Sequence, residues 1–508
     1  MKLNKQEQDG EEVPIISSDN SDSNYSYKKN SKKFPLKLFI NRKYILDILY
    51  MILIFILLSI FFYYYNNKQL SQKITNLEQK IELLEHKIKD LSTSTVKKKI
   101  GIGVVLTSLY GNGIGRIISI LTELLVKTGK YDVYLINEKI EENDLPCYKY
   151  VKRVVHKKDK KEIEEFDRMN NIDIYILNND ISSYLDIYRS LGKKLIGIFH
   201  GVFYSCIFTN HTYIYNHWHR FKLFDSFIQI IADDYYIYNK LHFNNNIFIP
   251  NLYTFEHTLT PYSQLTHKNV LIVGRIDDVI KGTKYGVRAM AEHVKQIPDA
   301  QLYLVSADHD PRIINLIKQL KIEKNTHLIP FTRNISEYYL NASVLMVASL
   351  SESFPMVMNE GKAHGLPIVA FNIDYSPCFQ KGVITVDLFD YKAMGNEVVK
   401  LLNNYNYRIT KGMEAKLSLD MFKNKETIEK WGELFNSLLK GEDEYHKFQE
   451  KIEKQYYNET IAKERLERHY KYAQQFNKLF LCHSFENFTN AHYLSILKEC
   501  NIENLTNI

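Results

Sequence analysis

The chain has 508 residues, of which 45% are hydrophobic and 25% charged, and its formal net charge is +7. This length exceeds one hydrophobic core and allows two or three domains of ordinary globular composition. The modest charge, without a basic stripe or a nucleic-acid motif, gives no reason to expect nucleic acid as a partner. The five cysteines show no spacing typical of a metal site.

The first 65 residues predict a membrane anchor. Residues 1–43 are rich in Ser, Asn and Lys and are expected to be disordered. Residues 44–65 are almost wholly apolar, and about 20 such residues span a bilayer as a helix. Basic residues are denser before this segment than after it, which places the N-terminus in the cytosol. We therefore expect a signal anchor and a single-pass type II membrane protein, with the bulk of the chain in the lumen of the Golgi or endoplasmic reticulum. Six sequons permit glycosylation there, at Asn210, Asn334, Asn341, Asn458, Asn487 and Asn504.

Residues 66–96 predict a coiled-coil stem. Leu and Ile alternate at steps of four and three from Leu70 to Leu91, with Ile at every a position and Leu at every d position. This pattern favours two parallel strands, so we expect a parallel homodimer through residues 70–91. A single amphipathic stalk helix is the alternative.

Residues 97–255 predict a first Rossmann-like domain. A strand at 100–107, a glycine-rich turn at 109–115, a helix at 116–128 and a strand at 131–136 form a βαβ opening. Further strands are expected at 172–177, 194–199, 227–232 and 247–250. Strands that alternate with helices indicate a parallel sheet covered on both faces.

Residues 256–405 predict a second Rossmann-like domain after a Thr- and Tyr-rich linker. Its strands are expected at 270–274, 300–307, 326–331 and 344–349, with a further strand between the helix at 356–364 and Phe371. Its other helices are expected at 283–297 and 335–342. Residues 406–508 are patterned as helices. Within them Trp431, Leu434, Phe435, Leu438 and Leu439 form an apolar stripe that can pack on the core. The predicted fold is α/β, with two Rossmann-like domains facing a cleft.

Charged residues gather where the strands of the second domain end. Arg275 ends the first strand and Lys281 follows in the turn, an arrangement that suits a diphosphate. Glu352 lies in the loop after strand 344–349, and Glu360 lies inside the next helix. Pro355 suits the first turn of that helix.

Two backbone features add anion sites to these side chains. The free N–H groups of Met356 and Val357 lie at a helix N-terminus, where the helix dipole favours an anion. In the first domain Gly111, Gly113 and Gly115 permit a close approach of backbone to phosphate. Together they predict anion binding from both walls of the cleft.

Two other interpretations of these patterns stay open. The glycine-rich turn also suits a nicotinamide-dependent enzyme, although the second strand ends on Asn137 rather than on an acid, with Glu138 next. Asp308, His309 and Asp310 suggest either a metal-binding Asp-x-Asp or a turn after strand 300–307, of which we favour the turn. We expect no metal.

Residues 270–375 resemble the nucleotide-sugar domain of the group-1 (family 4) glycosyltransferases, which have the GT-B fold. The resemblance is carried by Gly274-Arg275, Lys281-Gly282, the pair Glu352 and Glu360 with seven residues between them, and His364-Gly365-Leu366-Pro367. The first domain is similar more loosely, through the glycine-rich turn, His200 after a strand, and Ile249-Pro250-Asn251. The family often has Gly-Phe-Gly where this chain has Ser353-Phe354-Pro355.

The resemblance implies a role for each matched residue. Glu360 would bond the ribose hydroxyls, Arg275 and Lys281 would neutralise the leaving diphosphate, and Glu352 would hold the donor sugar. His200 would face the sugar from the first domain, and Gly113 would approach the phosphates. Enzymes of this family retain anomeric configuration and need no metal.

The expected function is therefore transfer of a hexose from a nucleotide-diphosphate sugar to a glycan, glycolipid or glycoprotein acceptor. The alternative is a catalytically inactive nucleotide-sugar-binding or scaffold protein on the same fold.

Overall fold

In the computed structural model of the chain, the described residues are 49–54, 56, 98–110, 112–142, 144–155, 159–178, 181–201, 218–240, 243–276, 280–307, 310–373, 381–421, 423–465 and 467–468. The chain divides into two compact units, residues 1–97 and residues 98–508.

Little of the first unit is described. Residues 49–54 and 56, inside the predicted apolar span 44–65, are helical. Across the described residues, we find no helix with both the length and the apolar character needed to cross a membrane. The predicted tail 1–43 and the predicted coiled-coil stem 66–96 lie outside the described residues.

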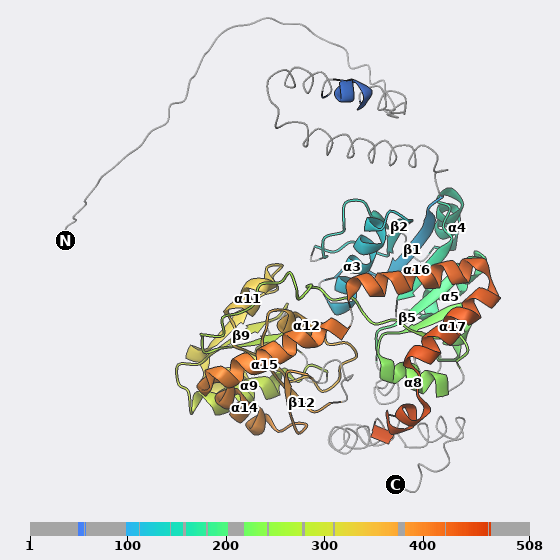
Figure 1. Ribbon diagram of the computed structural model, residues 1–508. Coiled ribbons are helices and arrows are strands. Elements are labelled where there is room, and N and C mark those ends of the chain that lie inside the picture. Colours follow the sequence, from blue (N-terminus) through green and yellow to red (C-terminus); the bar gives the residue numbers. More distant parts are fainter. Residues whose placement is uncertain are drawn as a thin grey trace, which may run out of the picture. The chain divides into compact units, whose positions relative to one another are not determined.

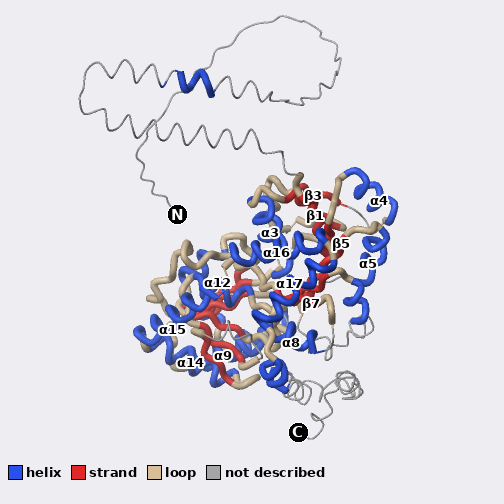
Figure 2. Tube along the Cα trace, turned by 45° about the vertical axis from the view of Figure 1, so that its right-hand side comes forward, coloured by secondary structure: helices blue, strands red, loops and turns tan. Residues whose placement is uncertain are grey.

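The second unit contains two parallel sheets with helices around them, as Figures 1 and 2 show. The first sheet has the strand order β3-β2-β1-β4-β5-β6-β7. Its strands are β1 (Ile100–Leu106), β2 (Tyr131–Asn137), β3 (Lys152–Val155), β4 (Ile174–Asn178), β5 (Lys194–Phe199), β6 (Ser226–Gln229) and β7 (Asn246–Phe248). All its strand pairs are parallel.

The second sheet repeats this topology, in the order β10-β9-β8-β11-β12-β13. Its strands are β8 (Asn269–Val273), β9 (Gln301–Val305), β10 (Thr326–Ile329), β11 (Val344–Val347), β12 (Ile368–Phe371) and β13 (Val383–Val386). The strand order reverses between β1 and β4 in one sheet and between β8 and β11 in the other. Open α/β sheets bind ligands outside the carboxyl ends of the strands at such reversal points.

Both sheets have helices on their faces. The helices of the first domain are α3 (Gly113–Lys127), α4 (Lys160–Met169), α5 (Ile181–Ser190) and α8 (Ala232–Lys240), with a 3-10 turn at Trp218–Leu223. Those of the second are α9 (Thr283–Val294), α10 (Pro311–Gln319), α11 (Ile335–Asn341), α12 (Met356–Ala363), α14 (Tyr391–Asn403) and α15 (Tyr405–Leu417), with 3-10 turns at Glu323–Asn325 and Ser418–Met421. Every residue of β4 and β12 is buried, as expected for parallel strands covered on both sides.

The last described helices return to the first domain. They are α16 (Asn424–Lys440) and α17 (Glu442–Tyr456), and α16 runs beside α3 in Figure 1. Phe435 packs edge-on against Tyr131 with ring centroids 5.4 Å apart, and the Tyr445 hydroxyl donates to the backbone oxygen of Asn245 over 3.1 Å. Four of the five residues of the predicted apolar stripe are buried, whereas Leu439 is exposed because it falls on the outer side of α16.

Several element boundaries differ from those predicted. Helix α3 begins at Gly113 rather than at 116, because the Asn112 side chain accepts from the Gly115 N–H over 2.8 Å and caps the helix there. Strand β6 ends at Gln229 rather than at 232, since α8 begins at Ala232. Strands β3 and β13 were not predicted.

His293 on α9 has a fully buried side chain, which predicts that the stability of the protein depends on pH. Burial lowers its pKa to about 4, against 6.5 for an ordinary histidine, and the Ala289 carbonyl acts weakly in the opposite sense. The unfolded chain therefore binds a proton that the folded chain excludes between these two pH values, so stability falls as pH falls through that window. We expect His293→Leu to reduce the stability loss between pH 7 and pH 4.5 by about 2.5 kcal/mol, measured by urea unfolding. Equal losses in the two proteins would contradict this.

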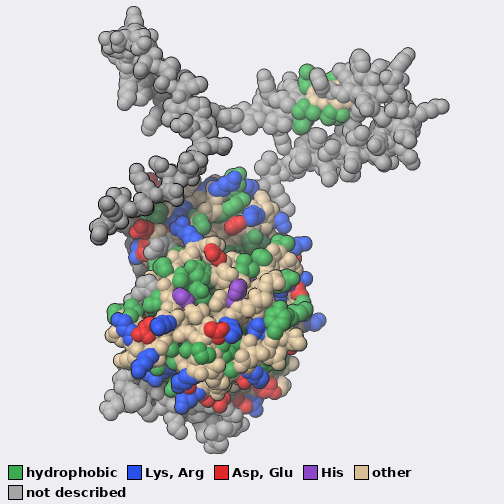
Figure 3. Space-filling model, turned by 90° about the vertical axis from the view of Figure 1, so that its left-hand side faces the viewer, with side chains coloured by type: hydrophobic (Ala, Val, Ile, Leu, Met, Phe, Trp, Pro, Cys, Tyr) green, Lys and Arg blue, Asp and Glu red, His purple; other side chains and the backbone are tan. Residues whose placement is uncertain are grey.

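The surface of the second unit carries charges of both signs. On the face drawn in Figure 3, basic and acidic side chains are interspersed. Exposed ion pairs of the second domain include Lys268 with Asp299 at 2.7 Å and Lys295 with Glu292 at 2.9 Å. Exposed pairs of this kind add little stability, so the buried sheets hold the domain together.

Candidate functional site

A cleft of about 350 Å³ lies where the carboxyl ends of both sheets meet. Its lining comes from the segments after β1, β5, β6, β7, β8, β9, β10 and β11, which include loops at both reversal points. The structure brings seven of the eight predicted site residues to this lining: Gly113, His200, Arg275, Lys281, Glu352, Met356 and Val357. Glu360 is not part of the lining.

Lys281 and Glu352 form an ion pair at the wall of the second domain. The Lys281 ammonium donates to Glu352 Oε1 over 2.5 Å, and the Ser349 hydroxyl donates to the same oxygen over 2.7 Å. The Glu352 side chain is 8% exposed and that of Lys281 is 26% exposed. The second oxygen of Glu352, Oε2, has no partner among the described residues, so it can accept a hydrogen bond from a hydroxyl group in the cleft.

The N-terminus of α12 adds backbone donors beside this pair. The helix begins after Pro355, which lacks an N–H and makes no side-chain cap. The N–H groups of Met356 and Val357 are bonded to no acceptor in the described part of the chain, whereas those of Met358 and Asn359 bond to the Pro355 oxygen. Free N–H groups and the helix dipole together favour an anion at this end.

His200 follows β5 and faces the cleft from the first domain. Its Nε2 lies 2.9 Å from Asn178 Oδ1, and the Asn178 amide is oriented by its own donation to the Val105 oxygen over 3.0 Å. Because an amide oxygen only accepts, Nε2 carries the proton. Burial lowers the pKa of His200 to about 4, so the ring is neutral at neutral pH.

Glu360 lies behind the cleft wall, and its side chain is fully buried. Oε1 accepts from the Arg116 guanidinium and from the Thr254 hydroxyl at 2.9 Å, and Oε2 accepts from the Tyr339 hydroxyl at 2.8 Å. The carboxylate raises the pKa of Arg116, while burial raises that of Tyr339 well above its usual value. In the structure Glu360 therefore bonds to three protein groups, whereas the resemblance implied a bond to the ribose hydroxyls.

Contacts between the two domains frame the cleft. The Ser353 hydroxyl donates to the His200 backbone oxygen over 2.7 Å, and Arg333 donates to the Asp144 backbone oxygen over 3.1 Å. Gly113 faces the N-terminus of α12, since a Cβ added to it would lie 3.8 Å from Met356 Cγ. The walls are therefore close enough for one ligand to touch both domains.

The other two interpretations of the sequence receive less support from the geometry. Asn137, at the end of β2, is buried and donates to the Leu106 oxygen over 2.8 Å while accepting from Arg153 over 2.7 Å, so it is not available to a cofactor. Asp310 caps α10 by accepting from the Arg312 N–H over 2.8 Å, whereas Asp308 and His309 lie outside the described residues. Within the described ranges no group of three or more His, Cys, Asp or Glu residues could hold a metal ion.

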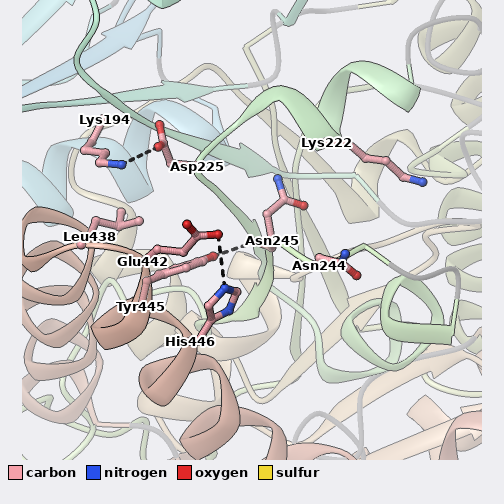
Figure 4. A pocket seen from close by; sticks show the side chains of 10 residues that line it. Lys194, Lys222, Asp225, Asn244, Asn245, Leu438, Glu442, Tyr445 and His446 are labelled. Atoms are coloured by element: carbon pink, nitrogen blue, oxygen red, sulfur yellow. Dashed lines mark hydrogen bonds and ion pairs between the residues drawn. The ribbon is translucent and has the colours of Figure 1, made fainter.

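A second cavity, of about 540 Å³, lies between α17 and the loops before β6 and β7 (Figure 4). Its charged groups pair with one another: Lys194 donates to Asp225 over 2.9 Å, and His446 lies 3.5 Å from Glu442. Lys194 begins β5 and Asp225 precedes β6, so this cavity lies at the amino ends of the strands. We assign the candidate site to the smaller cleft at the carboxyl ends.

Sequence reasoning missed Arg116, Asn178 and Tyr339. Arg116 is the first basic residue after the glycine-rich turn, and this position was a usable signal. Asn178 ends a strand that was predicted, at the sheet edge where site residues gather. Nothing in the sequence distinguished Tyr339 from the other 36 tyrosines of this chain, which has 37.

Comparisons with known proteins find one family model that matches most of the second domain. Residues 267–404 match the family model described as Glycosyl transferases group 1. An uncharacterized glycosyltransferase of Haemophilus influenzae is 31% identical over 208 residues, which cover 38% of this chain and 55% of that protein. The poly(glycerol-phosphate) alpha-glucosyltransferase of Bacillus subtilis is 22% identical over 226 residues, 43% of this chain and 32% of that protein. The chain thus spans about half the length, or less, of these curated relatives.

Solved structures resemble the chain over a larger share. Sucrose-phosphate synthase from Thermosynechococcus elongatus has a TM-score of 0.57 and 17% identity, and the match covers 67% of this chain and 99% of that one. Anabaena HepE in complex with UDP and glucose has a TM-score of 0.55 and 12% identity, with 66% and 99% covered. At these identities the likeness establishes the fold.

The comparisons also correct the predicted location. The expected type II protein of the Golgi or endoplasmic reticulum is wrong, because the curated relatives are glycosyltransferases of bacteria such as Haemophilus influenzae and Bacillus subtilis. The expected glycosylation of the sequons depended on that location and falls with it. The charge asymmetry around an apolar segment can orient the segment but does not identify a compartment.

The likeness in fold to the solved structures and the family match of residues 267–404 both agree with the resemblance that was drawn from the sequence motifs. Residues 267–404 match the model of the group 1 glycosyltransferases, and the second unit of the chain has the GT-B fold.

Proposed function

We propose that the protein is a glycosyltransferase that transfers a hexose from a nucleotide-diphosphate sugar to a glycan, glycolipid or glycoprotein acceptor. One observation carries the proposal. The Lys281–Glu352 pair and the free N–H groups of α12 converge on one cleft that His200 and Gly113 line from the other domain. These groups match the parts of a sugar nucleotide, because cations and N–H groups suit its diphosphate and the carboxylate suits its hydroxyl groups.

Lys281, Arg275 and the α12 N–H groups would stabilise the leaving diphosphate. Negative charge grows on the bridging oxygen as the bond to the sugar breaks, and fixed positive groups aimed there lower the barrier. Because these fixed cations and N–H groups can neutralise the diphosphate by themselves, they support catalysis without a metal. Closure of the domains around the donor would exclude water and limit its hydrolysis.

Retention of configuration is the proposed stereochemical outcome. Glu352 is the one carboxylate among the described cleft-lining residues, and it is paired with Lys281. His200, with a pKa of about 4, is a weak base at neutral pH. Neither group is suited to deprotonating an acceptor hydroxyl, which supports a mechanism in which the leaving phosphate oxygen takes that proton.

An assay of the full chain with nucleotide sugars tests the proposal. UDP-glucose is the first donor to try, with GDP- and other UDP-sugars in parallel, because UDP and glucose occur in the HepE complex. We expect slow release of nucleoside diphosphate without acceptor, faster release with a glycan acceptor, and an α-linked product from an α-linked donor by NMR. Treatment with EDTA should leave the rate unchanged.

Other outcomes of this assay would contradict the proposal in different ways. Tight binding of nucleoside diphosphates without turnover would favour the inactive nucleotide-sugar-binding or scaffold protein. Affinity for NAD with none for nucleoside diphosphates would favour a nicotinamide-dependent enzyme. An inverted product would refute retention, and a rate lost with EDTA would refute metal independence.

A further inference from the structure

Arg116 lies between the two domains and reaches the cleft. It belongs to the first turn of α3, directly after the glycine-rich turn of the first domain. Its guanidinium donates from Nη1 to Glu360 Oε1 in the second domain. The Arg116 side chain is 20% exposed and lines the cleft, whereas the Glu360 side chain is 0% exposed and does not. A ligand in the cleft therefore meets the guanidinium and not the carboxylate behind it.

The Arg116 guanidinium has more N–H donors than its contact with Glu360 uses. It carries five N–H groups, and Glu360 is its one acceptor among the described residues. A partly buried guanidinium with open donors can bind a further acceptor, and a phosphate oxygen matches its planar fork. Gly113, one turn earlier on α3, faces the α12 N-terminus, so a diphosphate held there lies within the reach of Arg116.

Glu360, by contrast, has little capacity left for a ligand. A carboxylate offers about four lone-pair positions, and Arg116, Thr254 and Tyr339 already occupy three of them. These three partners come from α3, the linker and α11. Such surroundings suit a group that holds a neighbouring side chain in place.

We infer that Arg116 is a donor-binding residue contributed by the first domain, which binds the diphosphate of the nucleotide, and that Glu360 is a positioning residue that holds its guanidinium at the cleft. The inference rests on the proposed function and changes the role that the resemblance implied for Glu360. It also gives the first domain a cation that faces Arg275 and Lys281 across the cleft, so the diphosphate is neutralised from both sides.

Calorimetric binding of UDP to the full chain, with GDP in parallel, tests this inference without turnover. We expect Arg116→Ala to weaken binding by about tenfold or more. Arg116→Lys keeps a cation near Glu360 but removes the fork, and it should still weaken binding several-fold in a folded protein. We expect Glu360→Gln to weaken binding by a similar factor. Arg116→Ala with Glu360→Gln together should be no weaker than Arg116→Ala alone, because both changes remove one interaction.

A matched control and a sugar analogue make the test specific. Arg153 forms a comparable pair with Asp144, at 17% and 5% exposure, away from the cleft lining. Arg153→Ala should lower stability and leave UDP affinity unchanged. Glu360→Gln should weaken UDP and 2′-deoxy-UDP by equal factors if Glu360 does not touch the ribose.

Three results would overturn the inference. They are unchanged UDP affinity in both Arg116 variants, additive effects in the double variant, or a larger loss of affinity for UDP than for 2′-deoxy-UDP in Glu360→Gln. Failure of the proposed function would look different. If the variants change UDP binding as expected but the chain shows no turnover, only the proposed catalysis is refuted. If the wild-type chain binds neither UDP nor GDP, both fail.

Discussion

Replacing Lys281 by alanine is expected to lower the rate of sugar transfer by about 100- to 1000-fold, the usual effect of losing one preorganised group that stabilises developing negative charge. Lys281 lies in the cleft with its ammonium 2.5 Å from Glu352 Oε1. Its removal takes a cation from the leaving diphosphate and leaves Glu352 with only the Ser349 hydroxyl. The fall should appear mainly in kcat, measured as release of nucleoside diphosphate, because charge on the leaving group peaks in the transition state.

Lys295→Ala is the matched control for this prediction. Lys295 is the C-cap residue of α9, the helix that follows Lys281, and its side chain is 66% exposed and paired with Glu292 on the surface. Its replacement should change neither the rate nor the melting temperature beyond error. If Lys281→Ala retained more than about a tenth of the wild-type rate, electrostatic stabilisation at this position would be refuted.

The part of the site that the sequence predicted is local in the chain. Arg275, Lys281 and Glu352 each lie in the loop that follows a strand, and parallel strands bring such loops to one edge of a sheet. Pro355 likewise predicted the start of α12 locally, because proline is favoured in the first turn of a helix. The start of the helix in turn predicted the free N–H groups. Periodicity places a residue at the end of a strand, and topology then brings these ends together.

The part that the sequence could not predict depends on side chains from distant elements. Glu360 was expected to face a ligand, but Arg116, 244 residues away, and Tyr339 bind it instead. No pattern in either segment reveals this pairing. The neutral state of His200 likewise depends on its burial and on the Asn178 amide, both of which arise from packing.

The missed elements of the fold are short or only partly buried. Strand β3 has four residues, two of them basic, and lies at one edge of the first sheet. Strand β13 lies at an edge of the second sheet and has one buried residue of four. Strand β3 therefore carries a weak apolar pattern and resembles a loop in the sequence, whereas β13 reads VITV and was missed although its residues favour a strand. The apolar stripe of α16 predicted that this face of the helix is buried. The stripe alone could not predict that α16 packs on the first domain, because that contact depends on residues such as Tyr131.

Replacing Gly282 by alanine is expected to destabilise the second unit by roughly 2–5 kcal/mol, the sum of left-handed strain and overpacking. Gly282 is the N-cap of α9 with φ of 56°, a conformation that disfavours a side chain. An added Cβ would lie 2.3 Å from the Ala348 backbone oxygen, so the loop would have to move. That loop also bonds through the Ile280 oxygen to the Leu350 N–H over 2.7 Å. Denaturant unfolding of the purified variant measures the loss, and we expect nucleotide affinity to fall as well because Lys281 is the preceding residue.

Gly129→Ala separates backbone strain from steric conflict. Gly129 has φ of 73°, and no atom lies within 4 Å of the Cβ it would gain, so its replacement should cost only the left-handed strain of about 1 kcal/mol. It lies in the turn between α3 and β2, away from the cleft lining, and nucleotide affinity should stay unchanged. Equal losses of stability in Gly282→Ala and Gly129→Ala would mean that the loop before α9 can move away from the Ala348 oxygen at little energetic cost. In that case the close contact with Ala348 would not be what holds Lys281 at the cleft.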